Sequence, residues 1–151
     1  MIEVEKEHKF LVVNTDFVKE ADKILQIKQG YISHSEYDPE VRISIRKPHA
    51  WIMIKDRKAD LTRDEFRVQI PPEEAEALLK KYCKDAVIEK TRFIIPIDST
   101  LNWEVDLFHN PKGQMLAEVE SESLDFLKDN RPSWLGDEVT GDPDYYNCNL
   151  V

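Results

Sequence analysis

Short stretches in which apolar and polar residues alternate one for one recur along most of this chain. Successive side chains of an extended strand point to opposite faces, so each stretch predicts a strand with one apolar and one charged face. The chain is therefore expected to consist mainly of strands. The predicted strands cover residues 5–12, 42–46, 52–55, 63–70, 90–93, 103–107 and 118–122.

Apolar residues at helical spacing predict three helices between these strands. The first covers residues 14–25, and a third covers about 122–128. The clearest covers residues 72–83, where Pro72 suits the first turn and Glu73 and Glu74 lie at the positive end of the helix dipole. Residues 132–151 predict loop and short helix.

Two sheet architectures fit the alternation. One is an open antiparallel sheet with a solvated charged face, which alternation alone favours. The other is a barrel with its charged face inward and its apolar face under helices. The segregation of charge signs favours the barrel, because some strands carry only cations and others only carboxylates on that face. The basic positions are Arg42/Arg46 and Lys90/Arg92, and the acidic ones are Glu104/Asp106 and Glu118/Glu120/Glu122.

Length and composition limit the classes of protein. The 151 residues, 41% of them hydrophobic, suffice for one domain with a sizeable core. The net charge of -9 argues against a general nucleic-acid surface. No apolar run is long enough for a membrane span, and no glycine-rich phosphate loop is present. The two cysteines lack metal-site spacing and no secretory leader is recognisable, so we expect a reducing, cytoplasmic location.

The first predicted strand carries the most informative chemistry. Glu5, Glu7 and Lys9 share one face, which places two carboxylates and an ammonium in one strip. Such a strip suits a divalent cation next to an anion. Together with the basic and acidic strands, it predicts a site for a metal–polyphosphate complex, in which cations bind phosphate oxygens and carboxylates bind the metal.

These blocks resemble a known family. Glu5-x-Glu7-x-Lys9 followed by Phe-Leu-Val resembles the ExExK signature of CYTH domains, the triphosphate tunnel metalloenzymes. Later blocks resemble the family in order, including its QGYL turn at 29–32 and its basic hairpin at 41–55. The others are 63–66, 89–93, 105–108, 117–120 and the C-terminal segment 134–147. The resemblance covers nearly the whole chain and implies a single CYTH-like domain, residues 1–151.

The resemblance implies an α+β fold in which an eight-stranded antiparallel β-barrel, flanked by a few helices, encloses a charged lumen. It implies a triphosphatase that uses Mg²⁺ or Mn²⁺, most simply on inorganic tripolyphosphate. Three alternatives stay open: a class IV-type adenylate cyclase, a thiamine or nucleoside triphosphatase, and a polyphosphate-binding module without turnover. The expected partner is a small molecule with a triphosphate group, without nucleic acid or membrane, and a homodimer stays open.

The resemblance also assigns roles by position. The residues expected to bind phosphate are Lys9, Arg42, Arg46, Lys55, Lys90 and Arg92. Those expected to bind metal are Glu5, Glu7, Asp106, Glu118 and Glu120. Lys90, Arg92 and Glu65 are the catalytic candidates, and the general base is a lumen carboxylate, either Glu65 or Glu120.

Two positions depart from the family pattern. Ser44 stands where the basic hairpin usually carries a second arginine, and Arg46, two residues on and on the same face, is a replacement for it. Arg67 stands where the family carries a carboxylate. If Arg67 faces the lumen, its charge should strengthen phosphate binding and weaken metal binding nearby.

Overall fold

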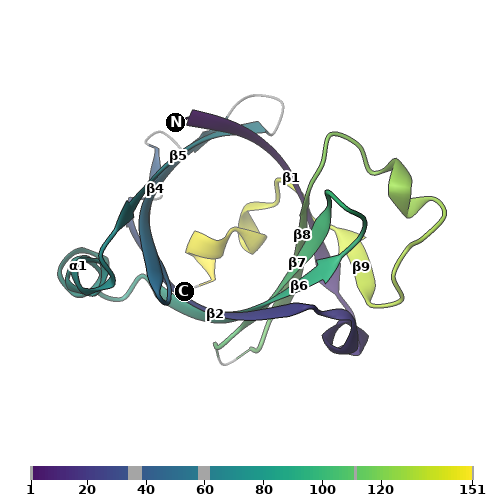
Figure 1. The fold of residues 1–151 in the computed structure, drawn as a ribbon, viewed down its shortest axis with the longest axis horizontal. Coiled ribbons are helices and arrows are strands. Elements are labelled where there is room, and N and C mark those ends of the chain that lie inside the picture. The colour runs from purple at the N-terminus through teal and green to yellow at the C-terminus, as the bar shows by residue number, and fades with distance from the viewer. Residues whose placement is uncertain (1, 34–38, 58–61, 111, 151) are drawn as a thin grey trace.

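Antiparallel strands form a closed barrel in the computed structural model, which describes residues 2–33, 39–57, 62–110 and 112–150 (Figure 1). Within these residues, eight strands form the barrel and a ninth extends it, in the order β5-β4-β3-β2-β6-β7-β8-β1-β9. This confirms the predicted eight-stranded barrel. The strands are β1 (Ile2–Val12), β2 (Lys23–Ser33), β3 (Glu40–Arg46), β4 (His49–Arg57), β5 (Thr62–Ile70), β6 (Val87–Pro96), β7 (Asn102–Phe108), β8 (Met115–Glu120) and β9 (Leu135–Glu138).

β1 closes the barrel because its two halves pair with different neighbours. Residues 2–6 pair with β5, and residues 7–11 pair with β8. The register places Glu5 opposite Arg63 and Lys9 opposite Glu118. Closure leaves no long unpaired edge among the described barrel strands, and it brings the charged strip of β1 between cations and carboxylates of its neighbours.

The largest part of the core lies outside the barrel, on the outer faces of β1, β6, β7 and β8. The 3-10 helix η1 (Asp16–Glu20) and the loop that follows β8 cover this face (Figure 1). Trp134 and Phe17 are almost fully buried there, and Trp103 packs edge-on against Trp134 at a centroid distance of 5.6 Å. The buried members are Phe10, Phe17, Phe93, Ile95, Trp103, Val105, Ala117, Val119, Trp134 and Leu135.

A second outer cluster lies under the helix α1 (Pro72–Leu78), which continues as a π-helical turn, Leu79–Cys83. Ala75, Leu79 and Cys83 of this segment pack on Ile43 and Ile45 of β3. The helix therefore begins and ends where the sequence predicts. Tyr82 of the same segment is 52% exposed, although its helical spacing from Leu78 and Leu79 predicts that it is buried with them.

Gly30 of β2 allows close contact with this helical segment. A Cβ atom at Gly30 would lie 2.6 Å from Cδ2 of Leu79 and 2.8 Å from Cβ of Cys83. We therefore expect Gly30→Ala to lower the free energy of unfolding by about 1–3 kcal/mol through overpacking. Urea denaturation measures this loss, and unchanged stability would contradict the close contact.

A third apolar cluster fills one end of the barrel from inside. Tyr31, Ile88, Phe108 and Leu116 pack there against Leu150. Figure 1 shows the C-terminal segment lying across the ring of strands, with its 3-10 turns η4 (Pro143–Tyr145) and η5 (Asn147–Asn149). The lumen is thus charged over only part of its length, because this end is an apolar plug.

Some expectations about the elements are wrong. Residues 14–25 do not form one helix, because only Asp16–Glu20 is helical, as a 3-10 turn, and β2 begins at Lys23. The expected turn at 29–32 lies inside β2. The helix near 122–128 is the 3-10 turn η3 (Asp125–Leu127), and β8 ends at Glu120.

The helices also cover less of the barrel than expected. Ile54, Phe66 and Val68 lie on the outer face of β4 and β5, and each is at least 36% exposed. Ile2 and Val4 of the neighbouring β1 are exposed as well. Among the described residues, no helix combines the length and apolar character required to cross a membrane.

Candidate active site

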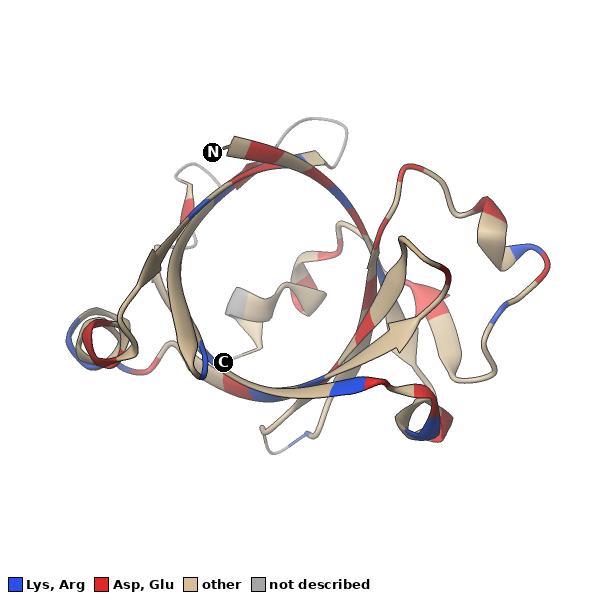
Figure 2. Cartoon of the chain, viewed as in Figure 1, with Lys and Arg blue, Asp and Glu red and all other residues tan. Residues whose placement is uncertain are grey.

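A polar cavity of about 570 Å³ occupies the barrel lumen beside the apolar plug. In the described part of the chain, its lining includes seven carboxylates and seven cations. The carboxylates are Glu5, Glu7, Glu40, Glu65, Glu104, Glu118 and Glu120, and the cations are Lys9, Arg42, Arg46, Lys55, Arg63, Arg67 and Arg92. Figure 2 shows acidic and basic residues on the strands that form the ring. The charged face is therefore the inner face.

Glu40 of β3 organises two of these cations. Its Oε1 accepts a hydrogen bond from Nη2 of Arg42 at 2.6 Å, and its Oε2 lies 3.3 Å from Nη2 of Arg63. Burial would raise the pKa of Glu40, but the charges of Arg42, Arg63 and Lys55 outweigh it and hold this pKa at about 2. Glu40 therefore stays charged and fixes both guanidinium groups in the lumen.

This depressed pKa predicts an acid-sensitive contribution to stability. A carboxyl whose pKa falls from 4.5 to about 2 on folding stabilises the protein by about 3 kcal/mol at neutral pH. Glu40→Gln should lose that contribution at pH 7, and the difference from the wild type should shrink as the pH falls from 4.5 towards 2. Urea denaturation at several pH values measures it.

The exposed ion pair of Lys28 and Glu76, at 3.2 Å, supplies the control. Glu76→Gln should change stability by less than about 1 kcal/mol, because solvent screens exposed pairs. If Glu40→Gln costs no more than Glu76→Gln at pH 7, the buried network contributes no special stability.

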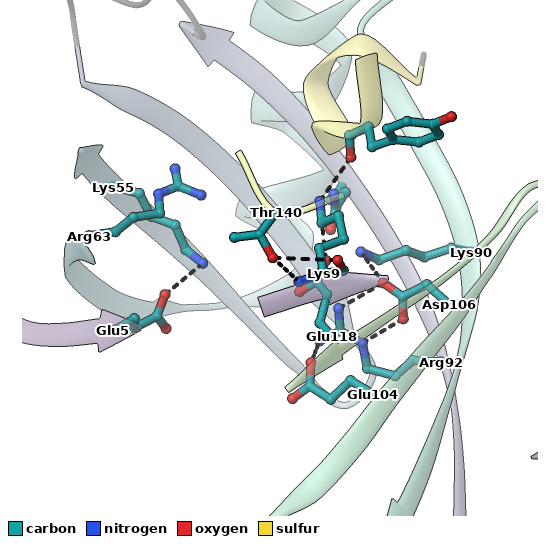
Figure 3. Close-up of polar contacts among 12 residues, drawn as sticks. Glu5, Lys9, Lys55, Arg63, Lys90, Arg92, Glu104, Asp106, Glu118 and Thr140 are labelled. Carbon is teal, nitrogen blue, oxygen red and sulfur yellow. Dashed lines mark hydrogen bonds and ion pairs between the residues drawn. The ribbon is translucent and has the colours of Figure 1, made fainter. Parts of the chain in front are cut away.

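Glu5 and Glu65 form a carboxyl pair next to Lys55. Nζ of Lys55 lies 3.3 Å from Glu5 and 3.5 Å from Glu65 (Figure 3 shows the contact with Glu5). Burial and the hydrogen bond to Glu65 raise the pKa of Glu5. Burial would also raise the pKa of Glu65, but the bond from Glu5 and the charges of Lys55 and Arg67 lower it. The pair therefore tends to keep its proton on Glu5.

Glu7 and Glu118 form a second carboxyl pair deeper in the lumen. Burial and repulsion by Glu118 raise the pKa of Glu7 to about 8. Burial would raise the pKa of Glu118 too, but Lys9, Arg92 and Lys90 outweigh it and lower this pKa. Nζ of Lys9 lies 3.4 Å from Glu118 and donates to the carbonyl oxygen of Tyr145 at 2.9 Å. The plug thus contacts the charged site directly.

Asp106 connects two cations at the lumen wall. Its Oδ1 accepts from Nε of Arg92 at 2.7 Å, and its Oδ2 lies 2.8 Å from Nζ of Lys90 (Figure 3). Both Lys90 and Asp106 are at most 2% exposed, and neither is part of the cavity lining, whereas Arg92 is. Burial lowers the pKa of Lys90 to about 8, because the charge of Asp106 offsets the effect of burial only in part. This geometry favours a positioning role for Asp106, and metal binding by it stays a prediction.

Arg46, Arg67 and Trp51 meet at another part of the cavity. The guanidinium carbons lie 5.0 Å and 5.8 Å from the centroid of the Trp51 ring. Arg67 therefore faces the lumen, as does Arg46. In the described part of the chain, neither guanidinium makes a hydrogen bond or ion pair.

The donor chemistry of the lumen suits a hard divalent cation. Among the described residues, no three His, Cys, Asp or Glu side chains converge closely enough to hold an ion by themselves. The Glu5–Glu65 and Glu7–Glu118 pairs nevertheless each hold two carboxyl groups together. Mg²⁺ is commonly bound by one or two carboxylates and the phosphate oxygens of its substrate, so two carboxyl groups are a sufficient protein share.

The structure brings most of the predicted site residues into one cavity. Glu5, Glu7 and Lys9 lie on the lining together, and Lys90 and Asp106 lie behind it. Sequence reasoning missed the role of Glu40, although Glu40 continues the alternation of Arg42, Ser44 and Arg46. It also assigned no role to the lining residues Arg63, Thr100, Asn102, Tyr146 and Asn147.

Comparison with solved structures supports the same fold. A crystal structure of an inorganic triphosphatase superposes with a TM-score of 0.68 and 28% identity, covering 97% of this chain and 93% of that chain. A putative adenylyl cyclase from Hippeastrum, described as having dominant triphosphatase activity, gives a TM-score of 0.57. That similarity covers 83% of both chains at 11% identity, so it shows the fold alone.

Two curated relatives match nearly the whole chain. An inorganic triphosphatase of Acetivibrio thermocellus is 37% identical over 97% of this chain and 92% of its own length. An inorganic triphosphatase of Nitrosomonas europaea is 30% identical over 97% of this chain and 96% of its own length. No protein-family model matches the sequence. Similarity of this extent along both chains shows that this chain belongs to the inorganic triphosphatase family.

Proposed function

We propose that this chain hydrolyses inorganic triphosphate to phosphate and pyrophosphate in its lumen, and that it is a CYTH-type triphosphate tunnel metalloenzyme. The observation that carries the proposal is the lining itself. Among the described residues, seven cations face a cavity of about 570 Å³ that has an apolar plug at one end. A triphosphate is a compact polyanion, and these cations supply donors for its oxygens, while the seven carboxylates of the same lining suit an accompanying divalent cation.

The paired cations are arranged to bind phosphate oxygens. Arg42 and Arg63 are held by Glu40, and Arg92 by Asp106, so these guanidinium groups are oriented before the substrate arrives. Oriented donors stabilise developing charge without reorganisation during the reaction. An arginine also binds two oxygens at once, which fixes the orientation of a phosphate group.

The chemical step requires a water molecule and a proton acceptor. The oxygen of water attaches to a terminal phosphorus, the bridging P–O bond breaks, and pyrophosphate leaves. Of the two candidate bases, Glu65 has a lowered pKa and is the weaker acceptor. Burial and repulsion by Glu5 and Glu104 raise the pKa of Glu120, which lines the cavity. We therefore propose Glu120 as the proton acceptor.

Glu5, Glu7 and Glu118 are proposed to hold Mg²⁺ or Mn²⁺. Each belongs to a carboxyl pair in which a proton offsets part of the repulsion. A divalent cation would replace that proton and, when bound, would neutralise charge on the phosphate oxygens. The role of these residues is to present carboxylate oxygens to the lumen.

Phosphate release by the purified protein tests the proposal. We expect release from tripolyphosphate with Mg²⁺ or Mn²⁺, much slower release with a chelator, and little release from pyrophosphate. ATP serves as a comparison, and analysis for cyclic AMP tests the cyclase alternative. Absence of phosphate release above the buffer blank with either metal would overturn the proposal and favour a binding module.

A further inference from the structure

Two arginines of the cavity differ from the other cations that line it, because neither makes an ion pair with another described residue. Lys9, Arg42, Lys55, Arg63 and Arg92 each contact at least one carboxylate. In the described residues, Arg46 and Arg67 make no hydrogen bond or ion pair, and their guanidinium groups lie over the ring of Trp51. An arginine stacked on an aromatic ring keeps the N–H donors at its edge free to bind an anion.

The positions of these arginines place them away from the apolar plug. Arg42 pairs with Tyr31, which belongs to the plug, and Arg46 lies four residues farther along β3, about 13 Å away in an extended strand. Arg67 lies on β5 opposite Met53, and it is exposed. Both arginines therefore lie towards the open part of the cavity, where solvent and ligand enter.

Trp51 holds the two guanidinium groups near each other. Its ring lies between β3 and β5, because Trp51 pairs with Ser44 on one side and with Gln69 on the other. The ring of His49 lies 5.8 Å from it, and Nε2 of Gln69 lies 3.0 Å from Nδ1 of His49. Trp51 is thus a positioning residue, because both guanidinium carbons lie within 5.8 Å of the centroid of its ring. Such a pair is most stable when an anion lies between its members.

We propose that Arg46 and Arg67, stacked on Trp51, form a separate phosphate subsite that binds the outer phosphate of a triphosphate at the open end of the tunnel. This inference rests on the proposed function. A diphosphate that occupies the deeper carboxylate-lined part is too short to engage this subsite fully. Arg46 and Arg67 therefore contribute to discrimination between a triphosphate and pyrophosphate.

The double variant Arg46→Gln/Arg67→Gln tests this subsite. We expect KM for tripolyphosphate to rise about tenfold per guanidinium removed, since each loses charge-assisted hydrogen bonds, with kcat changed less than about threefold. Affinity for pyrophosphate should change less than about threefold. Trp51→Leu leaves both charges but removes the aromatic ring that they contact, so it should raise KM by a smaller factor. Trp51→Phe keeps an aromatic ring and should behave like the wild type.

The control variant Lys19→Gln/Lys80→Gln removes the same charge from exposed positions outside the cavity. It should leave KM unchanged, which separates a local subsite from a general effect of net charge. Melting curves of all variants establish that they fold. If the double variant keeps the KM of the wild type, or loses kcat alone, the subsite does not exist.

Binding without turnover separates this inference from the proposed function. Calorimetric titration with tripolyphosphate in a chelator, where no hydrolysis is expected, should show weaker binding by the double variant than by the wild type. That result supports the subsite even if the wild type releases no phosphate. A wild type that binds tripolyphosphate without releasing phosphate overturns the proposed function but leaves the subsite in place. Equal affinities of the two proteins for tripolyphosphate would overturn the subsite, whatever the activity.

Discussion

The double variant Glu5→Gln/Glu7→Gln is expected to lose metal-dependent phosphate release by on the order of 1000-fold while keeping its fold. Both side chains line the lumen, and each belongs to a carboxyl pair. Glutamine has nearly the same shape but cannot balance the charge of a divalent cation, which supplies several kcal/mol of stabilisation in such reactions. Steady-state phosphate release over a range of Mg²⁺ concentrations measures the loss.

The raised pKa of Glu7 predicts that its substitution is mild in the absence of metal. A carboxyl with a pKa of about 8 carries a proton at neutral pH, and glutamine reproduces that uncharged state. The melting temperature without metal should therefore stay close to that of the wild type. The stabilisation that Mg²⁺ gives the wild type should disappear in the double variant.

Glu73 and Glu74, exposed in the first turn of α1, supply the matched control. Glu73→Gln/Glu74→Gln changes the net charge by the same amount outside the lumen and should keep full activity. Near-normal activity of Glu5→Gln/Glu7→Gln at limiting Mg²⁺ would show that these carboxylates do not bind the metal.

The sequence predicts the inner and outer faces of most strands well, because a period of two is a local property. Glu5, Glu7 and Lys9 were expected on one face, and all three line the cavity. The same alternation also contains residues of the apolar plug. Tyr31 follows Gln29 by two residues, and Phe108 follows Asp106 by two, so each continues an inner face. What fills that end is Leu150, and no local pattern indicates a partner so far along the chain.

The failed helix over residues 14–25 has a similar cause. Phe17, Ala21 and Ile24 have helical spacing, yet Ile24 already belongs to β2 and pairs with Phe93 of β6. Adjacent apolar residues such as Ile24 and Leu25 fit either period, and pairing with a strand some seventy residues away determines the outcome. A local pattern carries no information about that partner.

The ion pairs of the site also depend on strand register. The sequence shows that Lys90 and Arg92 share a face and that Asp106 lies on an acidic strand, but not that they meet. β6 and β7 pair so that Arg92 lies opposite Asp106, which places one carboxylate against two cations. This contact favours a positioning role for Asp106 over the metal binding predicted from the sequence.

Asp106→Asn is expected to destabilise the protein by about 3–5 kcal/mol at neutral pH and to reduce activity with it. Asp106 is 2% exposed and compensates the buried charge of Lys90 and part of that of Arg92. Removing one partner of a buried ion pair leaves the other charge without compensation, which is the costly case. Urea denaturation at pH 7 measures the loss, and a change below about 1 kcal/mol would contradict this role.

The variant's stability should also recover as the pH rises. Burial holds the pKa of Lys90 at about 8, below its ordinary value of 10.5, and loss of Asp106 lowers it further because the carboxylate raises it. Between the folded and the unfolded pKa, the unfolded chain binds more protons than the folded one, so stability increases with pH in that window. The deficit of Asp106→Asn should therefore be smaller at pH 9.5 than at pH 7. Adding Lys90→Met should remove most of the deficit and its pH dependence, because the uncompensated ammonium is then absent. If the double variant keeps the full deficit, the loss of stability comes from the uncompensated charge of Arg92 instead.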